Sequence, residues 1–314
     1  MVQRPRVLWI TMTTFPQPAT DAELRIVAPR RSIREHVRDI WRYRELLQQL
    51  VRKELQVRYQ KSVLGFAWSM LNPLFLLIVY SIVFSILGTS FTWFSIWLLC
   101  GLLVWNFFST ALATGTASIV SNGYLVGKVN FPREVLPLAS IGAALIHLMF
   151  SIIFMVGVLV ATRFDVDWSY LWLTLPALVT VIVLASGLAI LLSAANAYAR
   201  DTGHLLDLFL LAWFWMTPIV YPFQLLSDKL ATGPLPTYLP LINPVTACII
   251  AIQRGVYGAP SVTGADGTVQ HLLPDLSQWW YLRNIGIAFA VSCLLLAVAI
   301  KVFDRAEANF AEVI

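Results

Sequence analysis

The chain has 314 residues, of which 58% are apolar and only 12% charged, and its formal net charge is +5. Soluble domains carry about 25% charged residues, so this composition excludes an ordinary soluble enzyme and favours a protein that crosses the membrane several times. The three cysteines are widely spaced, which indicates neither a disulfide framework nor a metal site. We expect an all-α integral membrane protein, because a helix satisfies its own backbone hydrogen bonds in lipid.

The N-terminal part is predicted to remain outside the bilayer. Residues 1–34 are expected to form a cytoplasmic extension, and residues 35–64 an amphipathic interface helix, because apolar side chains share one broad face there. Glu54 and Arg58 interrupt that face, four residues apart. They indicate either an ordinary i, i+4 ion pair or a cytoplasmic gate or partner contact. The gate would comprise Arg52, Lys53, Glu54, Arg58 and Tyr59.

Six transmembrane helices are predicted within residues 65–304, followed by a cytoplasmic tail in residues 305–314. At about 1.5 Å per helical residue, the first apolar run reaches roughly 33 Å, which is enough to cross a bilayer core. The fifth span is the shortest and carries Asp207 near its start. The predicted spans are Phe66–Leu87, Phe94–Gly115, Val135–Thr162, Tyr170–Leu192, Leu205–Tyr221 and Asn284–Val302.

The distribution of basic residues predicts the orientation. Thirteen of the 22 lysines and arginines precede residue 65. With the N-terminus inside, five more fall in cytoplasmic segments and only four outside, so the positive-inside rule places both termini in the cytoplasm. The net positive charge therefore reflects membrane topology and does not indicate a nucleic-acid partner, since no aromatic residues interleave with the basic ones in an RNA-binding pattern.

The loop in residues 116–134, between the second and third spans, is a candidate contact for a cytoplasmic subunit. Its charges predict that it lies in water, and prolines punctuate it. Such a loop is either a simple connection or a lever that accepts force from a partner. The residues proposed for the lever are Lys128, Asn130, Phe131, Pro132, Arg133 and Glu134.

The segment before the last span, residues 222–282, is predicted to lie outside and is rich in proline. Within it, Val245–Ile252 is apolar but too short to cross a bilayer, which favours a re-entrant or interfacial hairpin. An ordinary folded loop is the alternative.

No energy source is evident in the chain. Gly123 and Gly127 are separated by three residues, whereas a phosphate-binding P-loop has four, and Val129 stands where that loop needs Ser or Thr. We find no hydrolase or zinc-protease motif, and the centres of five predicted spans contain no Asp or Glu. We therefore predict a transport subunit that is not itself an enzyme, without catalytic residues, metal or bound cofactor.

The chain contains the motifs Tyr43–Leu47, Glu54–Trp68, Asn72–Pro73, Phe131–Pro137, and Asn243–Thr246 with Arg254 downstream. They resemble motifs of the permeases of ABC-type polysaccharide exporters, which move O-antigen, teichoic acid, capsule or galactan precursors. The resemblance implies a six-span subunit that pairs with itself as a homodimer in the bacterial inner membrane. It also implies two copies of a separate ATPase subunit, which bind ATP and Mg, and a coupling helix between spans two and three. The lipid-linked polysaccharide and membrane lipid would be the other partners.

Aromatic residues crowd the second and fifth predicted spans, and they suggest how a glycan would be held. Sugars present flat C–H faces that pack well on aromatic rings, although Trp and Tyr also mark bilayer interfaces. The candidate channel residues are Trp93, Trp97, Trp105, Phe107, Phe108, Trp213, Phe214, Trp215 and Tyr221.

The sequence therefore favours the permease of an ATP-driven exporter for a lipid-linked polysaccharide. One alternative is a membrane glycosyltransferase or lipid-sugar ligase that uses the outside acids Asp165 and Asp167. Another is a drug or lipid exporter of the same broad class.

Overall fold

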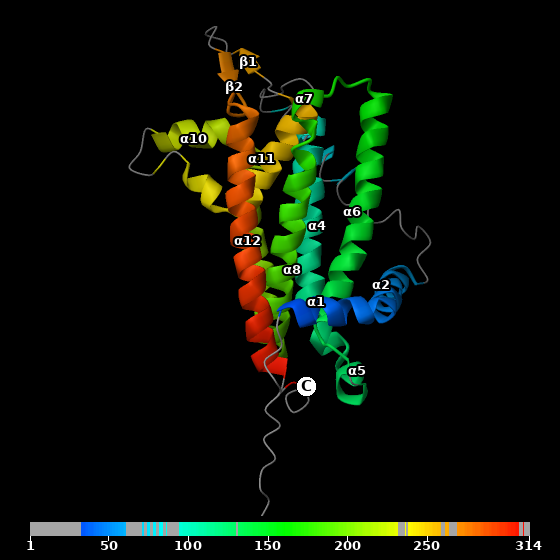
Figure 1. Cartoon of the computed structure of the whole chain (residues 1–314). Coiled ribbons are helices and arrows are strands. Elements are labelled where there is room, and N and C mark those ends of the chain that lie inside the picture. Colours follow the sequence, from blue (N-terminus) through cyan, green and yellow to red (C-terminus); the bar gives the residue numbers. More distant parts are fainter. Residues whose placement is uncertain are drawn as a thin grey trace, which may run out of the picture. The chain divides into compact units, whose positions relative to one another are not determined.

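In a computed structural model, the described residues are mostly helical (Figure 1). It describes residues 33–60, 94–129, 131–231, 236, 238–258, 261–263, 269–307 and 310, together with eight scattered positions between 71 and 86. The predicted extension in residues 1–34 therefore lies almost wholly outside the described residues. The same holds for most of the predicted first span, although its eight described positions are all helical.

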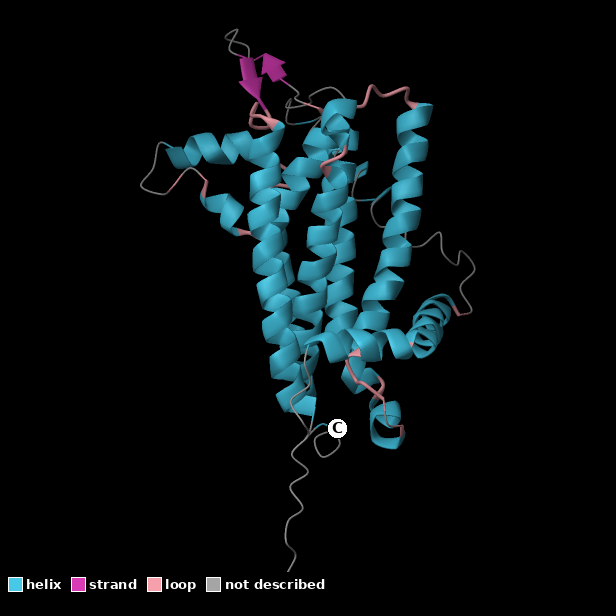
Figure 2. Cartoon of the chain, in the orientation of Figure 1, coloured by secondary structure: helices cyan, strands magenta, loops and turns pink. Residues whose placement is uncertain are grey.

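Figure 2 shows how little of the described chain is not helical. The strands β1 and β2 form one short antiparallel pair, with Ser261 opposite His271. The helices are α1 (Ile33–Arg42), α2 (Arg44–Tyr59), α4 (Phe94–Ser121), α5 (Gly123–Lys128), α6 (Val135–Ala161), α7 (Trp168–Leu171), α8 (Thr174–Tyr198), α9 (Asp201–Met216), α10 (Phe223–Ala231), the 3-10 turn η2 (Leu239–Ile242), α11 (Pro244–Tyr257) and α12 (Gln278–Glu307). The strands are β1 (Ser261–Thr263) and β2 (Val269–His271).

Four long helices run side by side, with α12 packed on α8, α8 on α4 and α4 on α6 (Figure 1). The helices α1 and α2 cross one end of this bundle, and α5 projects beyond it at the same end. We call this the α5 end. The opposite end carries α7, α10 and the β1–β2 pair, and we call it the hairpin end.

Within the described residues, four of the predicted spans are confirmed as helices that are long and apolar enough to cross a membrane. They are Phe94–Ser121, Val135–Ala161, Trp168–Tyr198 and Gln278–Glu307. Most extend beyond the predicted limits. The predicted second span ends at Gly115, but the helix continues to Ser121 because its last residues pack against α8 and α2 instead of lipid. Hydrophobicity alone locates the apolar centre of such a helix and misses its more polar ends.

The fifth predicted span differs most from the structure. It is expected at Leu205–Tyr221, whereas α9 begins at Asp201 and ends at Met216. Pro218 explains the early end: its ring would clash with the carbonyl of Phe214, and it forces the preceding Thr217 into an extended conformation. With 16 residues, α9 reaches about 24 Å, so it alone does not establish a sixth span.

The helices of the bundle approach closely where small residues meet. A Cβ on Gly115 of α4 would lie 2.7 Å from the Cβ of Ala189 in α8. A Cβ on Gly187, also in α8, would lie 2.6 Å from Cδ2 of Leu295 and 3.0 Å from the backbone nitrogen of Leu296 in α12. Small residues at such contacts let helices in lipid gain dispersion energy, since no hydrophobic effect drives them together there.

The segment before the last helix folds around α11. Asn243 caps this helix by accepting a hydrogen bond from the backbone N–H of Val245, and Pro244 occupies the first turn. Nearly every residue of α11 is buried against α4, α8, α7 and α12. Its 14 residues are too few to cross a bilayer, as the sequence predicts, and its re-entry into the membrane stays a prediction.

The close contact between α8 and α12 gives a direct test of the packing. We expect Gly187→Ala to destabilise the protein by about 1–3 kcal/mol, because the new methyl group meets the backbone of α12. Gly157→Ala in α6 is the matched control, since a Cβ there has no heavy atom within 4 Å. Thermal unfolding of the purified proteins measures both. Equal midpoints for the two variants would show that α12 can move away at little cost.

Candidate functional site

The α5 end joins several charged residues that lie far apart in the sequence. Helix α5 projects from the bundle, and its residue Tyr124 is 72% exposed, with Lys128 lying 4.0 Å from the centre of the tyrosine ring. On the opposite side of α5, Val126 is buried with Leu50 of α2 and Ile119 of α4. One face of this short helix is therefore fixed to the bundle, and the other is free to contact a partner.

The turn between α4 and α5 is tied to the amphipathic helix α2. Lys53 donates a hydrogen bond to Oδ1 of Asn122 at 2.6 Å, and Nδ2 of Asn122 donates to the carbonyl of Ser118 at 2.8 Å. The amide oxygen of Asn122 therefore accepts a hydrogen bond from α2, and its amide nitrogen donates one to α4. A displacement of α5 would act on both helices.

The strongest polar cluster at this end surrounds His36. This side chain is only 3% exposed, and its Nδ1 lies 3.2 Å from Oε2 of Glu134 at the start of α6. Its Nε2 lies 3.1 Å from Oδ2 of Asp304 in α12. Either a charged imidazolium donates a hydrogen bond to each carboxylate, or a neutral ring donates one hydrogen bond and accepts the other from a protonated carboxyl group.

Burial raises the pKa of Glu134 from its ordinary value near 4.5 to about 7. The nearby charge of His36 opposes this shift, while Asp304 and Glu307 reinforce it. The ligand atoms of His36, Glu134 and Asp304 lie within 4.8 Å of one another, a spacing that suits a metal ion. However, the two carboxylates approach opposite ring nitrogens, whereas a single ion would bind one of them, so hydrogen bonding accounts for the geometry.

The expectation that Arg133 and Glu134 lie in water is wrong. Glu134 is 3% exposed, and Arg133 donates from its guanidinium to the carbonyl of Glu307 at 2.7 Å. The sequence motif carries charge, but the ends of α6 and α12 come together and bury it. Phe131 is also buried, Lys128 remains exposed, and Pro132 lies in the turn before α6. Asn130 lies outside the described residues.

The predicted gate residues lie along α2. Arg52, Lys53 and Arg58 are exposed, and Glu54 is half-buried. In the described part of the chain Glu54 and Arg58 form no ion pair, so the ordinary i, i+4 interpretation finds no support there. The hydroxyl of Tyr59 lies 3.0 Å from Nδ1 of His147 in α6, which ties the end of α2 to that helix.

Four of the predicted channel rings form a cluster between α4 and α9, namely Trp105, Phe108, Trp213 and Phe214. The ring of Trp213 lies 5.1 Å from Phe108 and 6.5 Å from Trp105, and Trp105 lies 5.6 Å from Phe214. Of the predicted channel set, Trp97, Trp105, Phe107 and Phe108 are buried within the subunit, Trp213, Phe214 and Tyr221 are partly buried, and Trp215 is exposed. Trp93 lies outside the described residues. The rings with exposed surface are thus those from α9 onward.

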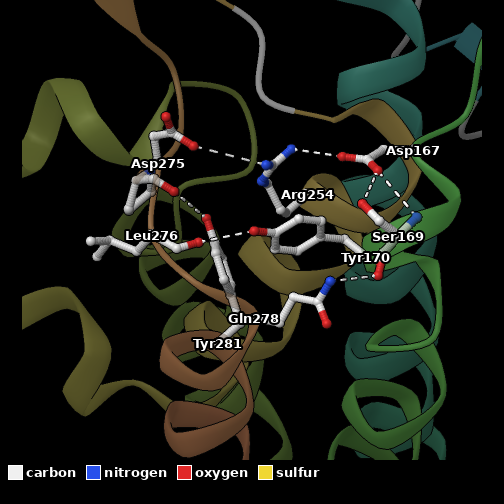
Figure 3. Close-up of polar contacts among 9 residues, drawn as sticks. Asp167, Ser169, Tyr170, Arg254, Asp275, Leu276, Gln278 and Tyr281 are labelled. Atoms are coloured by element: carbon white, nitrogen blue, oxygen red, sulfur yellow. Dashed lines mark hydrogen bonds and ion pairs between the residues drawn. The ribbon is translucent and has the colours of Figure 1, made fainter.

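A second polar cluster lies at the hairpin end (Figure 3). Nη1 of Arg254, at the end of α11, lies 3.0 Å from Oδ2 of Asp167, and its guanidinium lies 4.0 Å above the ring of Tyr170. Asp275 approaches the other nitrogen at 4.0 Å. Arg254 is buried, so these partners offset the cost of removing its charge from water.

The surrounding bonds extend this cluster across three elements. Tyr170 donates to the carbonyl of Leu276 at 3.2 Å, and Gln278 donates to the carbonyl of Ser169 at 3.0 Å (Figure 3). Asp167 also caps α7 by accepting from the backbone N–H and the hydroxyl of Ser169. Because Asp167 is engaged by both a cap and an ion pair, it is poorly placed to act as the free acid that a transferase would need.

Several of these residues were not identified from the sequence. His36 and Asp304 are single polar residues separated by 268 positions, and no local pattern relates them. Lys53 is part of the predicted gate, but its bond to Asn122 depends on how α2 lies on the bundle. The segment Phe131–Pro137 was recognised as a motif, although the burial of its glutamate was not.

The shifted pKa of Glu134 predicts a pH-dependent stability. Between about pH 5 and pH 7 the folded state keeps a proton that the unfolded state loses, so this carboxyl lowers the free energy of unfolding as the pH rises. Each pH unit in that window contributes up to about 1.4 kcal/mol. Glu134→Gln keeps a neutral hydrogen-bonding group, so its unfolding midpoint should rise relative to that of the wild type as the pH increases from 5 to 8.

The comparison of the wild type with Glu134→Gln changes one carboxyl group only. His36, Asp304 and Glu307 are present in both proteins, so the difference between the two pH curves reports Glu134 together with its electrostatic coupling to these three groups. The exposed acid Glu45 of α2 provides a second variant, and Glu45→Gln should follow the wild-type curve. Parallel curves for the wild type and Glu134→Gln would contradict the buried site.

Comparison with known proteins agrees with this architecture. Residues 45–257 match the family described as ABC-2 type transporter. The chain is 31% identical over 279 residues to the O-antigen export system permease protein RfbA of Myxococcus xanthus, covering 88% of this chain and 98% of the relative. It is 25% identical over 271 residues to a Klebsiella pneumoniae protein of the same name, covering 86% and 95%. The chain therefore belongs to the ABC-2 type transporter family, as a membrane permease component that lacks an ATPase domain.

Proposed function

We propose that this chain forms the membrane conduit through which an exporter moves a lipid-linked polysaccharide out of the cytoplasm. The similarity to O-antigen export permeases over nearly their full length carries this proposal. In it, two copies of the chain enclose the path, and two copies of a separate ATPase subunit supply the energy. ATP and Mg bind to that partner, and this chain contributes no catalytic residue.

The charge distribution supports an orientation in which the α5 end faces the cytoplasm. Helices α1, α2 and α5 contain eight of the basic residues, and the positive-inside rule places such segments on the cytoplasmic side. Both termini would then be cytoplasmic, in the inner membrane of a bacterium. The Arg254 cluster would lie outside, where the segment in residues 222–282 forms a gate at the exit.

The exposed face of α9 supports a path next to this helix. Leu208, Phe209, Leu211, Trp215 and Met216 are exposed, so much of α9 is not covered by the described part of the subunit. Exposed apolar surface on a span suits contact with lipid, a second copy or a substrate. A glycan passing along α9 would meet Trp213, Phe214, Trp215 and Tyr221, and the buried rings of α4 would hold these in place.

The function is tested by depleting the chain in its native cell. The lipid-linked glycan should accumulate inside, and wild-type protein should restore export. Trp215→Ala should slow export by about three- to tenfold, whereas Trp215→Phe should slow it less, because an aromatic face contributes about 0.5–1.5 kcal/mol. Trp215 is 54% exposed, so its removal leaves the core intact.

Trp279→Ala is the control, because Trp279 is also exposed but lies at the hairpin end of α12. Protein abundance is measured for every variant. A drug or bulk lipid that accumulates in place of the glycan would favour the alternative exporter, and normal export by Trp215→Ala would exclude this ring from the path.

The exposed face of α5 is proposed to contact the ATPase. The double change Tyr124→Ala and Lys128→Ala removes exposed groups, so insertion and folding should be unaffected. Export should fall by roughly three- to thirtyfold, as expected when a coupling of 0.5–2 kcal/mol is lost. ATPase activity of the assembled complex with and without glycan measures the same coupling.

A matched control lies at the same end of the bundle. Trp41 and Arg44 form another exposed aromatic–cation pair, with the guanidinium 5.6 Å from the ring. Replacing both with Ala should leave coupling unchanged. If the control pair reduces export as much as the α5 pair, the contact with the ATPase is not specific to α5.

A further inference from the structure

A cavity of about 360 Å³ opens between α4, α8 and α9 near the α5 end. Its lining is polar along one side, where Thr116, Asn196, Arg200, His204 and Asp207 converge. None of these residues takes part in the His36 cluster, the Arg254 cluster or the aromatic cluster. The transport path described so far therefore leaves this cavity without a role.

The inner wall of the cavity holds an unsatisfied hydroxyl. Thr116 is 1% exposed, and its Oγ1 has no hydrogen-bond partner in the described part of the chain. The neighbouring Asn196 bonds elsewhere: its Nδ2 donates to the backbone carbonyl of Thr116, and its Oδ1 accepts from the N–H of Gly203. A buried hydroxyl without a partner costs free energy, so a ligand that bonds to it would be stabilised.

The mouth of the cavity carries an arginine and a histidine. Arg200 and His204 lie four residues apart at the start of α9, and both are exposed. Across the described residues, neither makes an ion pair. The N-terminus of α9 adds its positive helix dipole, and an arginine fork matches phosphate oxygens well. These groups favour an anion with several oxygen atoms.

Beyond the mouth, the exposed side of α9 is apolar. Leu205, Leu208 and Phe209 continue from the cationic groups along the helix. A free anion would gain nothing from that surface, but a molecule with an anionic head and a hydrocarbon tail would contact both parts.

We propose that this cavity binds the phosphate-bearing headgroup of a membrane amphiphile, and specifically that of the lipid that carries the exported glycan. The second part rests on the proposed function. Arg200 binds the phosphate oxygens, Thr116 donates a hydrogen bond at the inner wall, and the tail lies against α9. The glycan attached to the same phosphate would then be held at the entrance to its path.

Asp207 is the acidic residue in the lining of this cavity. Its carboxylate lines the same cavity and opposes an anion, so it weakens binding and allows release. Neutralising Arg200 and neutralising Asp207 should therefore change affinity in opposite directions. A purely structural role for the two residues would not produce this pattern.

The test uses purified full-length protein in detergent, titrated with geranylgeranyl diphosphate and observed by native mass spectrometry. Arg200→Gln should weaken binding by roughly tenfold, the effect of losing one charge-assisted hydrogen bond. Thr116→Val, which keeps the shape, should weaken it by a few fold, and Asp207→Asn should tighten it. Lys301→Gln, an exposed charge on α12 at the same end, should have no effect.

Two competitors distinguish the source of the headgroup. Phosphatidylglycerol has a phosphate and a tail, and sodium pyrophosphate has no tail. We expect both to compete weakly. Equal competition by phosphatidylglycerol would overturn the assignment to the carrier lipid, and wild-type affinity in Arg200→Gln or an equal loss in Lys301→Gln would overturn the site itself.

Export in cells separates this inference from the proposed function. If Arg200→Gln loses binding but exports glycan at the wild-type rate, the site has no role in export and the proposed function stands. If depletion of the chain causes no glycan accumulation while the diphosphate still binds through Arg200, the proposed function fails and the headgroup site stands.

Discussion

A single buried imidazole joins the three parts of the chain that meet at the α5 end. His36 of α1 lies between Glu134, which precedes α6, and Asp304, which lies near the end of α12. Removing ionisable groups from water is costly, and each one here is tolerated because another compensates it. The position of the amphipathic helices therefore depends on the start of α6 and the end of α12 being in place. No single element can move without exposing or isolating a charge.

At the α5 end, the short helix α5 and the turn before it are held by contacts with α2 and α4. Val126 packs with Leu50 and Ile119, and Asn122 is bonded to Lys53 and to the last turn of α4. From that turn, α4 runs without interruption to the aromatic cluster that it shares with α9. We propose that a push on α5 reaches the rings through this continuous helix. Because Gly115 packs closely on Ala189, a displacement of α4 would also act on α8.

Much of this fold could be predicted from the sequence, since long apolar runs locate helices well. Three of the four described long spans begin or end beyond their predicted limits, because helix ends are fixed by packing and capping instead of hydrophobicity. The end of α9 had a local signal in Pro218, which the apolar run obscured. The amphipathic segment was predicted correctly as helical and polar on one side, but its break at Tyr43 was not.

The candidate site was less predictable, for a physical reason. A charge next to prolines in a loop is normally solvated, and nothing near Glu134 indicates that residues 36 and 304 will enclose it. For the aromatic residues, the sequence predicts which spans contain them. It does not predict which rings are buried, because that depends on how the helices pack.

The two ends of the bundle differ in how their buried charges are compensated. At the hairpin end, Arg254 is paired with Asp167 and packed on Tyr170, and arginine stays charged at any physiological pH. That cluster is permanent, and it fixes α7, α11 and the start of α12 to one another. At the α5 end, the pKa of Glu134 lies at about 7, so the same compensation depends on a proton that can leave. A protein that has to change shape in response to a partner on one side gains from this asymmetry. In the proposed function, the α5 end receives the force from the ATPase and can rearrange its charges, while the opposite end keeps the helices in register.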